Sequence, residues 1–153
     1  MSIIDLKERT DIISDFKLNA YYFQFNQLLS ELRKKELSPE TVNFINDQVA
    51  TINATAFIGN DLRKLVKQAQ TLILKHVEKV HKIAPKNYYR NLWMLLGFTA
   101  FGLPIGVSFG LSIGNIGLMG VGLPIGMAIG AAVGASMDKK ALNEGRQLDI
   151  EIK

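Results

Sequence analysis

The sequence has 153 residues, of which 48% are hydrophobic and 21% charged, with a formal net charge of +4 and no cysteine. This length allows one or two domains and excludes a large multidomain enzyme. The lack of cysteine excludes a disulfide scaffold, thiolate zinc sites and thiol chemistry. The charges are unevenly distributed, because residues 91–137 carry none.

Residues 1–86 are predicted to form a cytoplasmic helical head with coiled-coil-like apolar stripes. In the segment 3–35 the stripe consists of Ile13, Phe16, Ala20 and Phe23. The next two stretches carry stripes at spacings of three and four: Val42, Ile45, Val49, Ile52 and Ala56, and then Leu62, Val66, Ala69, Ile73, Val77 and Val80. Such stripes favour a three-helix bundle within one chain or helix pairing between chains, and periodicity does not choose between them.

Several residues predict where these helices begin and end. Ser38, Pro39 and Glu40 form a helix start, since serine caps, proline suits the first turn and glutamate faces the positive end of the dipole. Asn60 or Asp61 is expected to cap the third helix, after an interruption at Gly59. Pro85 is expected to end it.

Residues that carry chemistry are scarce. His76 and His81 are five positions apart, which is not the spacing of one helix face, so both are expected to be solvated. Neither a metal-ligand cluster, a phosphate loop nor a nucleophile motif occurs. The sequence therefore predicts a protein that is not an enzyme and has no cofactor or metal.

The uncharged run is too long for one membrane crossing and long enough for two, since about 20 helical residues cover a hydrocarbon core. The predicted spans are 88–113 and 117–137, with the turn at 114–116, where glycine and asparagine suit a reversal. The alternative is a glycine-rich buried helical pair in a soluble protein. A domain 87–137 and a short cytoplasmic tail 138–153 complete the predicted organisation.

Basic residues flank both ends of the run and are absent from the turn. They are Lys75, Lys79, Lys82, Lys86 and Arg90 before it, and Lys139, Lys140 and Arg146 after it. By the positive-inside rule both termini are expected on the cytoplasmic side of the inner membrane. The predicted membrane-interface anchors are Tyr88, Tyr89, Arg90, Trp93, Lys139 and Lys140. The positive charge is attributed to the membrane surface, and nucleic acid is not an expected partner.

The glycines of the run keep a four-residue register in an internal repeat, GLPIGVSFGLSIG at 102–114 and GLPIGMAIGAAVG at 122–134. They are Gly102, Gly106, Gly110 and Gly114, followed by Gly122, Gly126, Gly130 and Gly134. Residues i and i+4 share one helix face, so these glycines form a flat groove that admits another backbone. The grooves are predicted to pack the two spans together within one chain or to pack between copies.

Pro104 and Pro124 lie inside the repeat and each removes a helix hydrogen bond. They are interpreted either as packing kinks or as hinges used in gating.

In residues 97–137 the sequence resembles the glycine-zipper membrane proteins, a motif class that includes channel and pore-forming helices. The resemblance implies an all-α integral membrane protein with homo-oligomeric helix packing. Our first hypothesis is therefore a homo-oligomeric channel organised by the helical head. The alternative is a membrane-anchored scaffold whose head recruits a protein partner without conductance.

Overall fold

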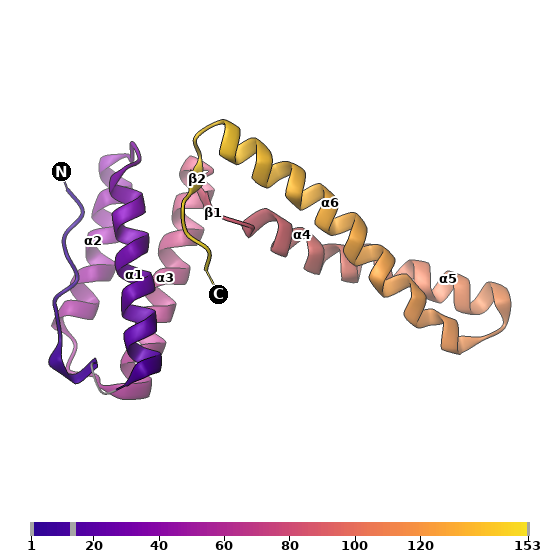
Figure 1. The fold of residues 1–153 in the computed structure, drawn as a ribbon, viewed down its shortest axis with the longest axis horizontal. Coiled ribbons are helices and arrows are strands. Elements are labelled where there is room, and N and C mark those ends of the chain that lie inside the picture. The colour runs from indigo at the N-terminus through magenta and orange to yellow at the C-terminus, as the bar shows by residue number, and fades with distance from the viewer. Residues whose placement is uncertain (1, 13–14, 153) are drawn as a thin grey trace. The chain divides into compact units, whose positions relative to one another are not determined.

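A computed structural model describes residues 2–12 and 15–152 of the chain (Figure 1). The described chain is mostly helical, as predicted, and divides into two compact units. The head contains the residues up to Ile83 together with Leu148–Ile152, and the hairpin unit contains Ala84–Gln147. Each unit is described by itself below.

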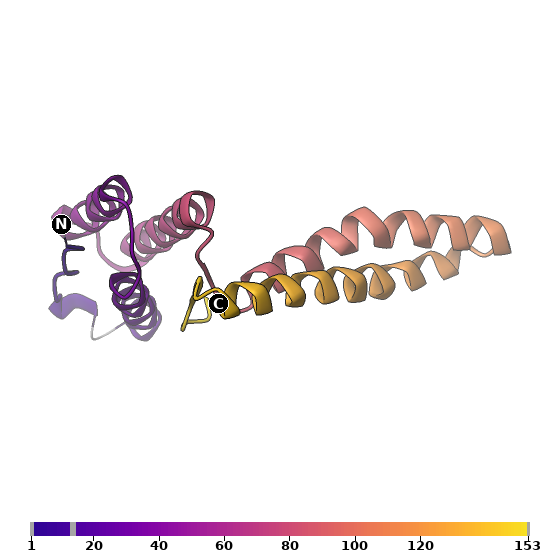
Figure 2. The ribbon, with the colours of Figure 1, turned by 90° about the horizontal axis from the view of Figure 1, so that it is seen from above.

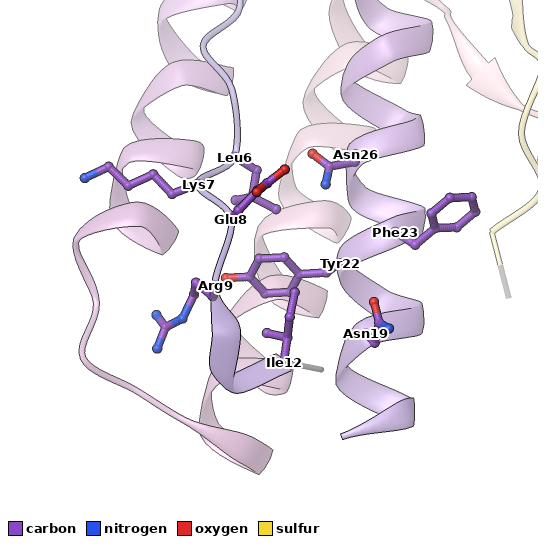
Figure 3. A pocket seen from close by; sticks show the side chains of 9 residues that line it. All are labelled: Leu6, Lys7, Glu8, Arg9, Ile12, Asn19, Tyr22, Phe23 and Asn26. Atoms are coloured by element: carbon purple, nitrogen blue, oxygen red, sulfur yellow. The ribbon is translucent and has the colours of Figure 1, made fainter. Parts of the chain in front are cut away.

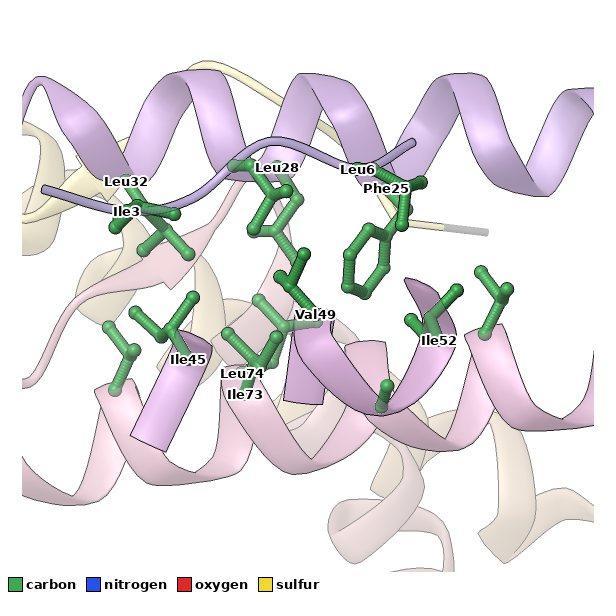
Figure 4. Close-up of a cluster of buried hydrophobic side chains, with 14 of the residues drawn as sticks. Ile3, Leu6, Phe25, Leu28, Leu32, Ile45, Val49, Ile52, Ile73 and Leu74 are labelled. Carbon is green, nitrogen blue, oxygen red and sulfur yellow. The ribbon is translucent and has the colours of Figure 1, made fainter. Parts of the chain in front are cut away.

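Three helices form the head within a single chain: α1 (Phe16–Arg33), α2 (Pro39–Ala54) and α3 (Gly59–His81). Both α1 and α2 pack against α3 (Figure 2), and the apolar faces of the three helices meet in one core (Figure 4). Phe25, Leu28 and Leu32 of α1 meet Ile45, Val49 and Ile52 of α2 above Ile73 of α3. The head is thus an intrachain bundle, one of the two arrangements that the stripes allowed.

The stripe predicted for the first helix is wrong. Phe16 is 86% exposed, Phe23 is 63% exposed and Ala20 is exposed as well, while Ile13 lies outside the described residues. The buried face of α1 consists instead of Leu18, Tyr22, Phe25, Leu28, Leu29 and Leu32. This face runs along the whole helix, so it buries more apolar area than the short stripe near the N-terminus of α1.

The other two stripes are confirmed except at their ends. Ala56 lies beyond the end of α2, and Val80 is exposed in the last turn of α3. Ser38 caps α2 as predicted, because its side chain accepts the backbone N–H of Thr41 at 3.3 Å. The predicted cap of α3 is wrong, since this helix begins at Gly59, where φ is +53°, before Asn60 or Asp61.

The N-terminal segment is extended before the short 3-10 turn η1 (Thr10–Ile12), although a helix was predicted from residue 3. Ile3 and Leu6 are buried in the head core. On α2, Asn46 accepts the backbone N–H of Ile4 at 2.9 Å, and Asn53 accepts that of Lys7 at 2.8 Å. The same two amides donate to the carbonyl oxygens of Ser2 and Asp5, so they replace the missing helical hydrogen bonds.

The hairpin unit consists of two long helical stretches and a turn. The first stretch comprises α4 (Tyr88–Gly97), the π-helical turn η2 (Phe98–Gly102) and α5 (Leu103–Ile113). The second comprises the 3-10 turn η3 (Ile116–Val121) and α6 (Gly122–Asn143), which extends past the uncharged run. Among the described residues, these two stretches are long and apolar enough to cross a membrane, over Tyr88–Ile113 and Ile116–Asn143.

Both ends of the hairpin are closed by backbone geometry. At the turn, Gly114 ends α5 in the left-handed region, with φ at +68°, and its N–H bonds the carbonyl of Leu111, so the predicted turn is confirmed. At the base, β1 (Ala84–Pro85) pairs with β2 (Gln147–Leu148), and the N–H of Ala84 donates to the carbonyl of Arg146 at 3.1 Å.

Candidate functional site: the glycine face and base of the hairpin

The two helical stretches lie side by side within one chain (Figure 2), and their glycine faces lie against each other. A Cβ atom on Gly126 would lie 2.6 Å from the Cα of Gly102, and one on Gly122 would lie 2.5 Å from the Cα of Gly106. Real Cβ atoms essentially never approach this closely. Larger residues at these positions would therefore push the helices apart, and glycine is required by the close approach of two backbones.

The predicted register differs from the observed glycine face at two positions. Gly97 was not predicted to belong to it, yet a Cβ there would lie 2.9 Å from the Cα of Gly130. Gly114 was included, but it forms the turn and a Cβ there would meet no atom of the described chain within 4 Å. The π-helical turn η2 explains Gly97, because its wider turn places residues five apart on one face.

Pro104 and Pro124 lie near the starts of helical segments. Pro104 is in the first turn of α5, directly after η2, and Pro124 is in the first turn of α6, directly after η3. In both places the helical geometry changes just before the ring, which accommodates the missing N–H. Hinge motion at these two residues remains a prediction.

The outer surface of the hairpin is apolar and uncovered. Only 22% and 17% of the most apolar parts of the two helical stretches are buried within the chain. The exposed large side chains belong to every part of the hairpin and include Leu95, Phe101, Leu103, Phe109, Leu111, Ile113, Ile116, Ile129 and Val133. In this respect the two stretches differ from the core helices of a soluble protein, which are mostly buried.

Within residues 91–137 of the hairpin, polar side chains are few and uncharged. The hydroxyl of Thr99 donates to the carbonyl oxygens of Leu95 and Leu96 in its own helix. The side chain of Asn115 accepts the N–H of Gly117 and so stabilises the turn. Ser108 and Ser112 are exposed on one face of α5.

Asp138 organises the base of the hairpin, and it was not among the predicted site residues. Asp138 is 8% exposed, and its carboxylate accepts the backbone N–H of Tyr89 at 3.1 Å and that of Arg90 at 2.9 Å. These N–H groups open α4, whose own N-cap residue, Asn87, makes no side-chain cap bond. Asp138 therefore caps α4 from α6 and compensates its positive end. The sequence offered one signal for Asp138, since it is the first charged residue after the uncharged run.

The predicted interface anchors lie around this base. Tyr89 is buried with Ala84 and Ala141, and Tyr88 and Trp93 pack on the same cluster. The rings of Tyr88 and Tyr89 meet edge to face, with centroids 5.2 Å apart.

Lys139 and Lys140 at the same base are exposed, and the Nζ atom of Lys140 lies 3.9 Å from Oε1 of Glu144. The side-chain hydrogen bond from Arg146 lowers the pKa of Glu144. The base thus combines aromatic rings with basic charges.

The expectation that both histidines are solvated is wrong. The Nε2 atoms of His76 and His81 lie 3.3 Å and 3.0 Å from the Oγ1 atom of Thr41, which is fully buried. Ser38 donates to the same oxygen at 3.0 Å, and Phe44 stacks on His76 with ring centroids 4.3 Å apart. The spacing of the two histidines along α3 did not reveal this cluster, because the residue at its centre, Thr41, belongs to α2.

The head also has a pocket of about 290 Å³ between the N-terminal segment and α1 (Figure 3). Arg9 lies at its edge, and its guanidinium donates to the carbonyl oxygens of Thr55 and Phe57. Glu8 and Lys7 bring opposite charges to the lining. Within residues 2–12 and 15–152, no three His, Cys, Asp or Glu side chains are grouped to hold a metal ion.

No protein-family model matches this chain, and no curated protein or solved structure matches it either.

Proposed function

We propose that this chain is a membrane-anchored helical module in which the hairpin inserts into the bilayer and the head recruits a protein partner at the cytoplasmic surface. The observation that supports this most is the division of the hairpin into two surfaces. Its glycines face inward, where they pack the two helices together, and its large apolar side chains face outward. A lipid-facing pair of helices requires this arrangement.

The base of the hairpin supports the orientation. The paired strands β1 and β2 hold both ends of the hairpin together, and two crossings return the chain to the side on which it entered. Arg90, Lys139 and Lys140 flank this end, whereas residues 91–137, with the turn at 114–116, carry no charge. Under the positive-inside rule the base is cytoplasmic and the turn lies on the other side.

The anchor is preferred over the channel because the glycine faces are already occupied within the chain. A pore built by zipping copies through these faces would have to break the contacts of Gly97 with Gly130 and of Gly102 with Gly126. The hairpin also has no ionisable side chain between residues 91 and 137 with which to attract an ion.

The topology can be tested with single introduced cysteines, because the chain has no cysteine of its own. Single cysteines at Ile116 and Asp149 should be modified by a membrane-impermeant reagent from opposite sides of the membrane. The protein should also stay in the membrane fraction after alkaline extraction. Release by alkali, or labelling of both positions from one side, would contradict the anchor.

The recruiting role requires a replacement experiment. An unrelated two-span hairpin in place of residues 91–137 should preserve the proteins that photo-crosslink to the head in cells. Loss of those crosslinks, with the chimera correctly inserted, would show that the hairpin does more than anchor.

A homo-oligomeric channel is the second candidate, and a second small-residue face favours it. Exposed residues in a four-residue register lie away from the glycine face on both helices: Pro104, Ser108 and Ser112, and Pro124, Ala128, Ala132 and Ser136. Small residues permit close packing between copies. A discrete ring in detergent together with conductance in liposomes, both abolished by Ser112→Leu and Ala132→Leu, would establish the channel. A monomer without conductance would exclude it.

A further inference from the structure

The outer face of α3 carries four exposed lysines, which we call the lysine face: Lys64, Lys67, Lys75 and Lys79. They lie opposite the side of the helix that Leu62, Val66, Ile73 and Val77 bury in the head core. The intrachain fold therefore uses one side of α3 and leaves a positively charged side toward solvent.

Few acidic groups neutralise this face. Lys64 lies 3.5 Å from Asp61, and both side chains are more than two-thirds exposed, so that pair is weak. Glu78 lies 3.7 Å from Lys82, outside the lysine face. Among the residues that the structure describes, Lys67, Lys75 and Lys79 have no ion pair.

A shallow depression lies beside two of these lysines, Lys64 and Lys67. It has a volume of about 370 Å³ and is lined by Lys64, Lys67, Gln68, Thr71 and Leu72. The two ammonium groups suit a phosphate, and the side-chain amide of Gln68 can donate hydrogen bonds to its oxygens. The hydroxyl of Thr71 already donates to the carbonyl oxygen of Lys67 at 2.9 Å, and Leu72 is 40% exposed beside these groups. The apolar face of α3 is buried in the head core, so the attraction of this surface to lipid comes mainly from its clustered positive charge.

We infer that the lysine face docks on anionic lipid headgroups of the bilayer that holds the hairpin. This inference rests on the proposed membrane anchoring. Only residues 82–87 separate α3 from α4, and Arg90, Lys139 and Lys140 at the base of the hairpin carry the same sign of charge. Residues 82–87 thus tether the lysine face to the membrane and give it a high effective concentration at the anionic surface. For this reason anionic lipid is favoured over a soluble acidic protein as the binding partner of the lysine face.

The test uses the full chain in nanodiscs of phosphatidylcholine, with or without phosphatidylglycerol. A single label at Thr71→Cys reports docking through its access to an aqueous quencher, and a label at Ala50→Cys on exposed α2 surface serves as the reference. In discs with phosphatidylglycerol the Thr71 label should become protected, while the Ala50 label stays accessible. High salt should remove the protection, because screening shortens the range of these charges.

Charge variants make the test specific. Three substitutions, Lys67→Gln, Lys75→Gln and Lys79→Gln, are made singly and together as the lysine-face triple variant. Each single substitution should lower the ratio of docked to undocked molecules about fivefold. The matched triple variant Lys7→Gln, Lys17→Gln and Lys35→Gln removes the same charge elsewhere and should leave docking unchanged. If the lysine-face triple variant loses helical circular dichroism, the salt dependence of the unmodified face decides instead.

The outcomes separate this inference from the anchor. Equal access of the Thr71 label in both lipids would overturn the inference, as would equal loss in the two triple variants. Protection that appears only after an acidic protein is added would overturn it too, in favour of a protein partner. A label at Leu111→Cys, on the exposed surface of α5, reports insertion. If that label stays aqueous, the anchor itself has failed.

Discussion

The Oδ1 atom of Asp138 accepts a hydrogen bond from the backbone N–H of Tyr89 across 3.1 Å, although these residues lie 49 positions apart. Its other oxygen accepts the N–H of Arg90 at 2.9 Å. A side chain of α6 thus performs the capping role that is usually local to a helix. Because the cap connects the two arms of the hairpin, it also holds their register at the base.

Asp138→Ala should therefore destabilise the hairpin by about 1–2 kcal/mol, the usual cost of losing a helix cap. Asp138→Asn should cost less, since an amide oxygen still accepts one N–H. Thermal unfolding in detergent micelles measures both. Asp47→Ala, on the exposed surface of α2, serves as the control and should be neutral. An unchanged melting temperature for Asp138→Ala would contradict the capping role.

Gly130→Ala should disrupt the hairpin, because a Cβ there would lie 3.1 Å from the Cα of Gly97 and still closer to the carbonyl of Trp93. Overpacking of this kind costs about 1–3 kcal/mol, and because the crowded atoms belong to the backbone of α4, they have little room to relax. Gly120→Ala is the matched control, since a Cβ there would meet no described atom within 4 Å. Spin labels on α4 and α6 should move apart only in the first variant.

Thr41→Val should lower the free energy of unfolding by about 1–3 kcal/mol. The change keeps the shape of the side chain and removes the oxygen that His76, His81 and Ser38 share. Denaturant unfolding measures the loss. Thr71→Val makes the same chemical change on the exposed face of α3 and should be close to neutral. Equal stability of the two variants would show that the cluster contributes nothing.

Asn46→Ala and Asn53→Ala should release the N-terminal segment from α2. Each removal leaves a backbone N–H and a carbonyl of that segment without its amide partner. Amide hydrogen exchange at Ile4 and Lys7 should accelerate, while the helices of the head stay protected. Asn43→Ala, at an exposed position of α2, should leave exchange unchanged. Continued protection in the double variant would contradict this role.

The C-terminal tail should loosen from α1 in acid. The side-chain hydrogen bond from Lys34, aided by the backbone N–H of Asp149 at 3.1 Å, lowers the pKa of Glu31. The contact of Glu31 therefore contributes its full stabilisation above the pKa of this carboxyl in the unfolded chain, which is about 4.3. The stabilisation is lost as the pH falls through the lower pKa of the folded chain. An NMR titration of the Asp149 amide should show this transition, and Glu31→Gln should abolish it.

The helices could largely be predicted from the sequence, whereas their contacts could not. The first membrane-length helix has its predicted limits, and the Ser38 cap and the inward faces of α2 and α3 agree with their periodicity. The face of α1 was misassigned, because both Phe16 with Phe23 and Phe25 with Leu32 have helical spacing. Only the longer face finds partners on α2 and α3.

By itself the sequence determined where charge is absent, where glycine recurs and which segments are helical. These are local properties, since helix periodicity and backbone freedom depend on neighbouring residues. The tertiary structure alone decided that the glycine faces meet within one chain, that two histidines share Thr41, and that Asp138 caps α4. Each of these contacts joins residues far apart in the sequence, and so each depends on how the folded chain brings separate elements together.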